Sequence, residues 1–156
     1  MDPVRDETAA ERYDRNWIDL IQEVRVAQTG IQVLAGFLLT VPFSYRFADI
    51  AERDKVLFLV AFSLAMLTIG LMVAPVAIHR FLFGRGQKDI LVRVGDRMAK
   101  LGLVALGLTL IAVTTLIFDV VLSLVAGVVA GLVMLLFYTL IWAALPISLQ
   151  RYAGRN

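Results

Sequence analysis

The side chains best suited to chemistry lie on one side of the uncharged stretch that follows Arg25. They recur every three or four residues, which places them on one face of a helix: Arg25, Gln28, Gln32, Gly36 and Thr40. A cation and two carboxamides on one face can form a hydrophilic path or a ligand-binding surface, because polar groups at lipid depth avoid the acyl chains. Hydrogen bonding between helices, with close packing at Gly36, explains the same pattern. Both interpretations stay open.

Asp119 is the only Asp, Glu, Lys, Arg or His between residues 101 and 150. A proton- or sodium-coupled carrier uses a titratable carboxylate near the middle of the bilayer, and Asp119 is the one residue that offers it. Its position in the stretch also suits a turn residue that caps the following helix. We therefore add Asp119 to the candidate polar path and keep the capping role as the alternative.

A small-xxx-small pattern follows Asp119, and its members are Ser123, Gly127 and Gly131. Glycines four residues apart in an apolar helix let a second helix approach to backbone contact. With Gly36, these residues form the candidate helix-packing set. The partner helix is either the preceding span of the same chain or a second copy of the chain.

Basic and aromatic residues cluster at the ends of the apolar stretches. Five of them could attract anionic lipid at about 1 kcal/mol per charge, or act only as a topology signal: Arg85, Lys88, Arg93, Arg97 and Lys100. Four others are expected to anchor helices at the membrane interface: Trp17, Arg46, His79 and Arg80. The other possible role of His79 is as a pH sensor.

Several classes of function lack their residues. The chain has no cysteine and one histidine, so thiolate chemistry and His-pair metal motifs are excluded. It contains no Ser/His/Asp order, no HExxH motif and no potassium-filter sequence, and no acid lies between Arg25 and Arg46, where small multidrug carriers have one. The net charge of +2 gives no bulk attraction to nucleic acid. We expect no enzymatic activity and no cofactor.

The elements that must position these residues are membrane spans. The chain is 60% hydrophobic, with a mean hydropathy of +0.81, whereas soluble domains are about 45–50% apolar. About 20 apolar residues cross a bilayer, and residues 101–150 are too long for one crossing. The sequence predicts spans near residues 26–45, 56–78, 101–118 and 124–146, with breaks at Pro42, Asp119 and Pro146.

Two amphipathic segments precede the first and third spans, and each is expected to run directly into the span that follows it. Asn16 is the expected N-cap of an interfacial helix in which Asp19 helps to cap and Trp17 lies at headgroup depth. A basic amphipathic helix is expected between spans 2 and 3. The predicted fold is therefore an all-α four-helix transmembrane bundle with these two helices. Residues 1–15 form a flexible tail, residues 16–150 one domain and residues 151–156 a C-terminal tail.

The distribution of basic residues predicts the orientation. Three of the fifteen lysines and arginines lie in the 46–55 link, and the other twelve lie in segments that four spans place on the opposite side. Because cytoplasmic loops are rich in Lys and Arg, both termini are expected to face the cytoplasm.

Three segments resemble an uncharacterised family of small membrane proteins of high-GC Gram-positive bacteria: RNWIDLIQEVRVAQTG at 15–30, LTVPF at 39–43 and APVAIHRFLF at 74–83. The resemblance covers roughly residues 15–150. It implies a location in the bacterial plasma membrane and no mechanism, although some members carry a sodium/proton antiporter label.

We therefore expect a non-enzymatic membrane protein that works through helix packing and assembly into homo-oligomers. Its partners are expected to be the bilayer, anionic lipid included, and further copies of itself, without nucleic acid. The alternative is a small ion channel or a proton- or sodium-coupled transporter that uses the polar stripe on the first span.

Overall fold

The computed structural model describes residues 8–82 and 88–153, and within them it shows helices and no strand. The predicted all-α fold with four membrane spans is confirmed. In chain order the elements are α1 (Ala9–Thr40), the short 3-10 helices η1 (Val41–Phe43) and η2 (Tyr45–Asp49), α2 (Glu52–Leu82), α3 (Lys88–Val121), α4 (Leu124–Thr139), the π-helical turn η3 (Leu140–Ala144) and α5 (Leu145–Ala153).

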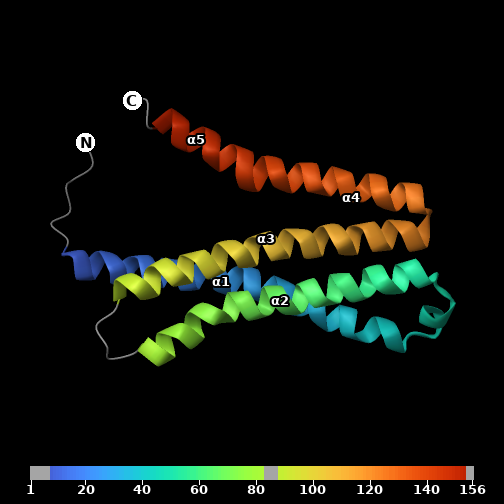
Figure 1. Ribbon diagram of the computed structural model, residues 1–156, viewed down its shortest axis with the longest axis horizontal. Helices are drawn as coiled ribbons and strands as arrows, with labels where there is room; N and C mark the ends of the chain where they lie inside the picture. Colours follow the sequence, from blue (N-terminus) through green and yellow to red (C-terminus); the bar gives the residue numbers. More distant parts are fainter. Residues whose placement is uncertain (1–7, 83–87, 154–156) are drawn as a thin grey trace.

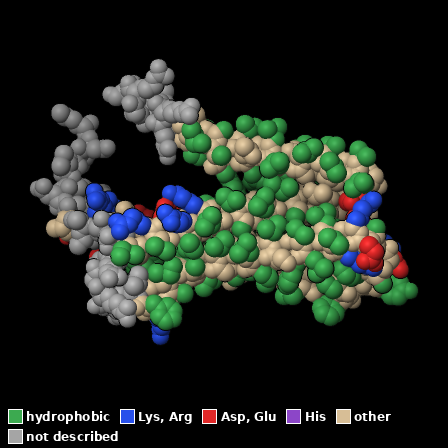
Figure 2. Space-filling view, in the orientation of Figure 1, with side chains coloured by type: hydrophobic (Ala, Val, Ile, Leu, Met, Phe, Trp, Pro, Cys, Tyr) green, Lys and Arg blue, Asp and Glu red, His purple; other side chains and the backbone are tan. Residues whose placement is uncertain are grey.

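Four helical segments are long and apolar enough to cross a membrane. They are Asp14–Phe43, Glu52–Phe81, Ile90–Val121 and Leu124–Leu149. The shortest has 26 residues, about 39 Å of helix at 1.5 Å per residue, against a hydrocarbon core of about 30 Å. Apolar side chains cover the long flank of the molecule, and charged ones gather towards its two ends (Figure 2). The chain is a multi-pass membrane protein.

The helices run antiparallel in sequence order, so the molecule has two distinct ends (Figure 1). The start of α1, the end of α2, the start of α3 and α5 lie at one end, which we call the terminal end. The link 41–51 and the turn at residues 122–123 lie at the other, which we call the opposite end.

The core is formed by α1, α2 and α3. Its centre contains small side chains such as Ala61, Ala65 and Ala112, around the larger Ile31 and Phe58. Small residues let helices approach closely, and dispersion then holds them together without a hydrophobic driving force. Among the described residues α4 contacts α3 and neither α1 nor α2, so most of its surface faces outward.

The helical start of the chain differs from the prediction. Thr8, and not Asn16, caps α1: the Glu11 amide donates to Thr8 Oγ1 at 3.3 Å, and the Thr8 amide donates to Glu11 Oε2 at 2.8 Å. The Thr8 hydroxyl also donates to Glu11 Oε2 at 2.7 Å, and this bond, together with the one from the Thr8 amide, stabilises the carboxylate and lowers the pKa of Glu11. A capping box therefore starts the helix at Ala9. Residues 9–15 are helical instead of a tail, and Asp19 has no capping role. The interfacial segment is continuous with the first span, as expected.

The second amphipathic segment leads directly into the third span, as expected. The basic residues from Lys88 to Lys100 form the first turns of α3, which continues without a break into the third span.

Three prolines lie near predicted helix ends, and only Pro42 follows an observed one. α1 ends at Thr40, before the predicted residue 45, and Pro42 lies in η1, which follows directly. Pro75 is buried inside α2, which continues to Leu82. The prediction that Pro146 ends the last span is wrong, because the helix continues to Ala153. The preceding turn is π-helical and therefore wider than an α-helical turn. The ring of Pro146 then avoids the carbonyl group four residues earlier, and the N–H that proline lacks is not needed for an α-helical hydrogen bond.

The turn between the last two spans lies later than predicted. α3 continues through Asp119 to Val121, and α4 begins at Leu124. Ser123 is the N-cap, since its Oγ accepts a hydrogen bond from the Ala126 amide at 3.3 Å. The predicted break and capping role at Asp119 are therefore wrong, and this carboxylate is available for another contact.

Candidate functional site

The predicted polar stripe lies on the outer side of α1. The helix turns Val24, Ile31, Ala35 and Leu38 into the core. At 100° per residue, most of the stripe is displaced from this face by roughly a quarter of a turn or more, and Gln28 lies nearer to it. Arg25, Gln32, Gly36 and Thr40 are exposed, and Gln28 is half-buried at the border. The stripe therefore does not line the interior of the chain, and it faces the region that acyl chains or another protein occupies.

The two carboxamides of the stripe are unpaired. Among the residues that the structure describes, neither Gln28 nor Gln32 has a hydrogen-bond partner. By contrast, the threonines on this side satisfy themselves: Thr29 Oγ1 donates to the Arg25 carbonyl at 3.0 Å, and Thr40 Oγ1 donates to the Phe37 carbonyl at 2.7 Å. Transfer of an amide from water to hydrocarbon without a hydrogen-bond partner costs several kcal/mol of free energy. A polar partner for these two side chains would therefore be stabilising.

Gly36 lies between these polar residues with open space around it. A Cβ added there would meet no atom within 4 Å, so Gly36 does not serve close packing inside the chain. The glycine leaves a notch in the outer surface of α1, next to Gln32. The stripe thus combines unpaired donors and acceptors with a site of close backbone approach.

Asp119 does not belong to this stripe. Its buried carboxylate accepts a hydrogen bond from Arg53 Nη2 at 3.0 Å, and Arg53 Nε lies 3.4 Å from Asp54 Oδ1. This cluster joins the start of α2 to the end of α3 at the opposite end of the bundle. The ion pair was not predicted. The available signal was that Arg53 and Asp119 flank adjacent spans at the same membrane side.

The glycines of α4 pack on α3 of the same chain. A Cβ on Gly127 would lie 2.8 Å from the Thr115 carbonyl oxygen and 2.9 Å from Asp119 Cβ, and a Cβ on Gly131 would overlap Thr115 Oγ1. Of the two partners left open by the sequence, the structure shows the chain's own third span. Ser123 contributes as the helix cap described above and not as a packing surface.

A second unpredicted polar contact lies in the middle of the core. Thr68 on α2 and Thr109 on α3 are fully buried, with their Oγ1 atoms 3.4 Å apart. Each hydroxyl also donates to a carbonyl of its own helix at 2.8 Å. The sequence did not predict this contact, because two isolated threonines in apolar stretches meet only when α2 and α3 are aligned in one particular way.

The interface anchors lie in three different settings. Trp17 stacks on His79, with ring centroids 5.3 Å apart and 17° between the planes, which fixes the start of α1 to the end of α2. Arg80 is exposed in the last turn of α2, and Arg46 is exposed on η2 at the opposite end. Gly95 completes the aromatic contact, because a Cβ there would lie 3.1 Å from the Trp17 ring.

The basic residues proposed for lipid contact lie at the terminal end. Arg93, Arg97 and Lys100 are exposed on α3, and Lys100 Nζ donates to Asp96 Oδ2 at 2.6 Å. Arg85 and the side chain of Lys88 lie outside the described residues. Within the described part of the chain, no group of three or more His, Cys, Asp or Glu residues could hold a metal ion.

The comparisons with known proteins agree with this architecture without adding an activity. No curated protein and no solved structure matches the chain. The model of a family of unknown function, DUF6328, matches residues 6–146, which include all four membrane spans except the end of the last. The chain therefore belongs to the DUF6328 family.

Proposed function

We propose that the protein is a non-enzymatic membrane protein of the bacterial plasma membrane that assembles with copies of itself through the polar stripe of α1. The observation that carries the proposal is the pair of unpaired carboxamides, Gln28 and Gln32, on an otherwise lipid-facing helix. Carboxamides carry both donors and acceptors, so the same stripe on a second copy satisfies them reciprocally.

The notch at Gly36 supports the same interface. Two identical helices can approach closely where each has a glycine, and a two-fold axis makes one patch contact itself. The glycines of α4 are already covered by α3, so they are not available for this contact.

The proposed orientation places both termini in the cytoplasm. In the sequence, twelve of the fifteen lysines and arginines belong to the N-terminal segment, the segment between spans 2 and 3 and the C-terminal tail, and the other three belong to the 46–55 link. The positive-inside rule assigns the segments richer in Lys and Arg to the cytoplasm. Anionic headgroups of that leaflet would then face Arg93, Arg97 and Lys100.

A test of assembly compares two double variants in native-membrane particles. Gln32→Leu with Gly36→Ile removes the amide and fills the notch, and we expect the oligomer to dissociate to single chains. The control, Gly70→Ile with Ser63→Leu, makes similar changes on the exposed face of α2, where a Cβ on Gly70 also meets nothing within 4 Å. It should leave the subunit count unchanged. An unaltered count in the first variant contradicts the interface.

The second candidate function is passage of ions or protons along the same stripe. The supporting observation is its length: Arg25, Gln28, Gln32 and Thr40 run from the middle of α1 to its last residue. If copies enclose this face, it becomes a polar channel. Reconstituted vesicles should then pass ions, and Gln28→Leu with Gln32→Leu should abolish the flux. Full flux in that variant excludes this path.

A further inference from the structure

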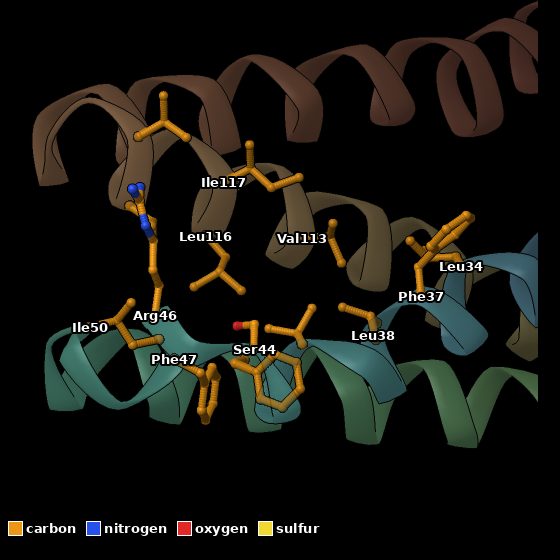
Figure 3. Close-up of a pocket in the computed structure, with 14 residues that line it drawn as sticks. Leu34, Phe37, Leu38, Ser44, Arg46, Phe47, Ile50, Val113, Leu116 and Ile117 are labelled. Atoms are coloured by element: carbon orange, nitrogen blue, oxygen red, sulfur yellow. The ribbon is translucent and has the colours of Figure 1, made fainter.

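An apolar cavity opens at the opposite end of the bundle, between the end of α1 and the end of α3. Its volume is about 360 Å³, within the range of small-molecule sites. Of the fourteen residues that line it, Ser44 and Arg46 are polar and the others are apolar. Figure 3 shows Arg46 and Ile50 at one extreme of the cavity and Leu34 and Phe37 at the other.

The cavity runs along the helices, and its length is close to the thickness of one membrane leaflet. On α3 it extends from Val113 to Val121, which is about 12 Å at 1.5 Å per residue. Half of a hydrocarbon core of about 30 Å is about 15 Å. A slot of this length, with its inner end towards the bilayer centre, matches the position of an acyl chain.

The outer wall of the cavity is open to the bilayer. Phe37, Ile117 and Val121 line it and are also exposed on the surface, so a lipid chain reaches it without crossing protein. Water gains nothing there, because an apolar cavity offers it no hydrogen-bond partners.

Arg46 supplies the charge that selects the occupant. It is the one charged residue of the lining, and among the described residues its guanidinium has no ion-pair or hydrogen-bond partner. It lies at the shallow extreme of the slot, on η2, which is where the headgroup of a lipid in that leaflet sits. A guanidinium binds phosphate oxygens through paired hydrogen bonds.

We propose that this cavity binds one acyl chain of an anionic phospholipid whose phosphate group is held by Arg46. The site is independent of the proposed assembly surface. Leu34, Phe37 and Leu38 lie on one flank of α1, and Thr29, Gln32 and Gly36 lie on the other.

The test uses the full chain in mild detergent with equal amounts of phosphatidylglycerol and phosphatidylcholine that carry the same acyl chains. Native mass spectrometry measures the fraction of protein that retains each lipid. We expect wild type to retain phosphatidylglycerol preferentially, and Arg46→Gln to reduce that preference roughly tenfold through the loss of one charge-assisted contact. Arg12→Gln, which removes an exposed arginine in the first turns of α1, is the matched control and should behave as wild type.

Filling the cavity tests the acyl chain separately. Leu116→Trp should abolish retention of both lipids, and Val120→Trp, at a half-exposed lining position, should do the same if the first variant does not fold. Unchanged retention in the folded filled variant, or unchanged selectivity in Arg46→Gln, overturns the proposal. So does a filled variant that loses dimer mass but keeps lipid, because the occupant would then be a second copy of the chain.

Discussion

Single residues decide how the spans are joined at the opposite end of the bundle. Asp119 is buried on α3, and its carboxylate is matched by Arg53, whose side chain is 55% exposed. A buried carboxylate is tolerated when a cation and hydrogen bonds compensate it, and the loss of its partner leaves a buried charge uncompensated. The arrangement makes Asp119 a structural anchor between α2 and α3.

Removing the arginine should therefore cost more than removing a neighbouring lysine. Arg53→Ala is expected to lower the free energy of unfolding by about 3 kcal/mol, at the low end for a broken buried pair because Arg53 is partly exposed. Lys55→Ala breaks the exposed pair of Lys55 and Glu52 and should cost less than about 1 kcal/mol. Unfolding in a denaturing-detergent titration measures both. Equal losses would show that Asp119 does not depend on Arg53.

Sequence reasoning located the residues of the site better than their roles. The stripe on α1 and the glycines of α4 were predicted from spacing, because helical periodicity fixes which residues share a face. Which way that face points depends on tertiary packing. The spacing of the stripe was compatible with a path inside the chain, but the stripe lies on the outside. Two contacts depend on how α2 and α3 are aligned: the pair of Arg53 with Asp119 and the pair of Thr68 with Thr109.

At the scale of helices, α3 and α4 approach each other closely at two glycines of α4. Gly127 and Gly131 bring the two backbones together near the opposite end, and Trp142, which follows in the π-helical turn, packs near Gly107. Trp142 comes after the two glycines in the chain, so the contact with α3 continues beyond them. This pair of helices forms a hairpin held by small residues and one large ring.

A methyl group added at a glycine of this hairpin should change the stability of the protein differently from one added at a glycine in open space. Gly127→Ala places a methyl group against the Thr115 carbonyl and is expected to destabilise the protein by about 1–3 kcal/mol through overpacking. Gly70→Ala meets nothing within 4 Å and should be neutral, or stabilising by up to about 1 kcal/mol from helix propensity. Thermal unfolding in detergent compares them. A neutral Gly127→Ala would contradict the close approach of α3 and α4.

The four spans were predictable because length and hydropathy determine them, whereas their ends were not. Thr8 forms a capping box eight residues before the predicted N-cap, Asn16, and the π-helical turn precedes Pro146 in a helix that continues past it. Both depend on local hydrogen bonds that hydropathy does not register. The start of α4 at Leu124 was predicted, but its cap is Ser123 and not Asp119.

At the scale of the whole molecule, three helices form a core and the polar side of α1 faces outward. A membrane helix turns polar groups away from lipid, and α1 has its apolar face in the core and two unpaired carboxamides outside it. A single chain leaves this stripe unsatisfied. The assembly that we propose, of copies through α1, would satisfy this stripe without any change of fold.

Site-directed crosslinking in native membranes tests this claim most directly, since the chain has no cysteine of its own. Thr29 on α1 and Thr139 on α4 are both exposed, and each hydroxyl donates to the carbonyl four residues earlier. Thr29→Cys and Thr139→Cys are therefore matched changes of similar size. Under mild oxidation, Thr29→Cys should give a disulfide-linked dimer and Thr139→Cys should remain a single chain. A single chain in both, or an equal yield of dimer from both, would contradict assembly through α1.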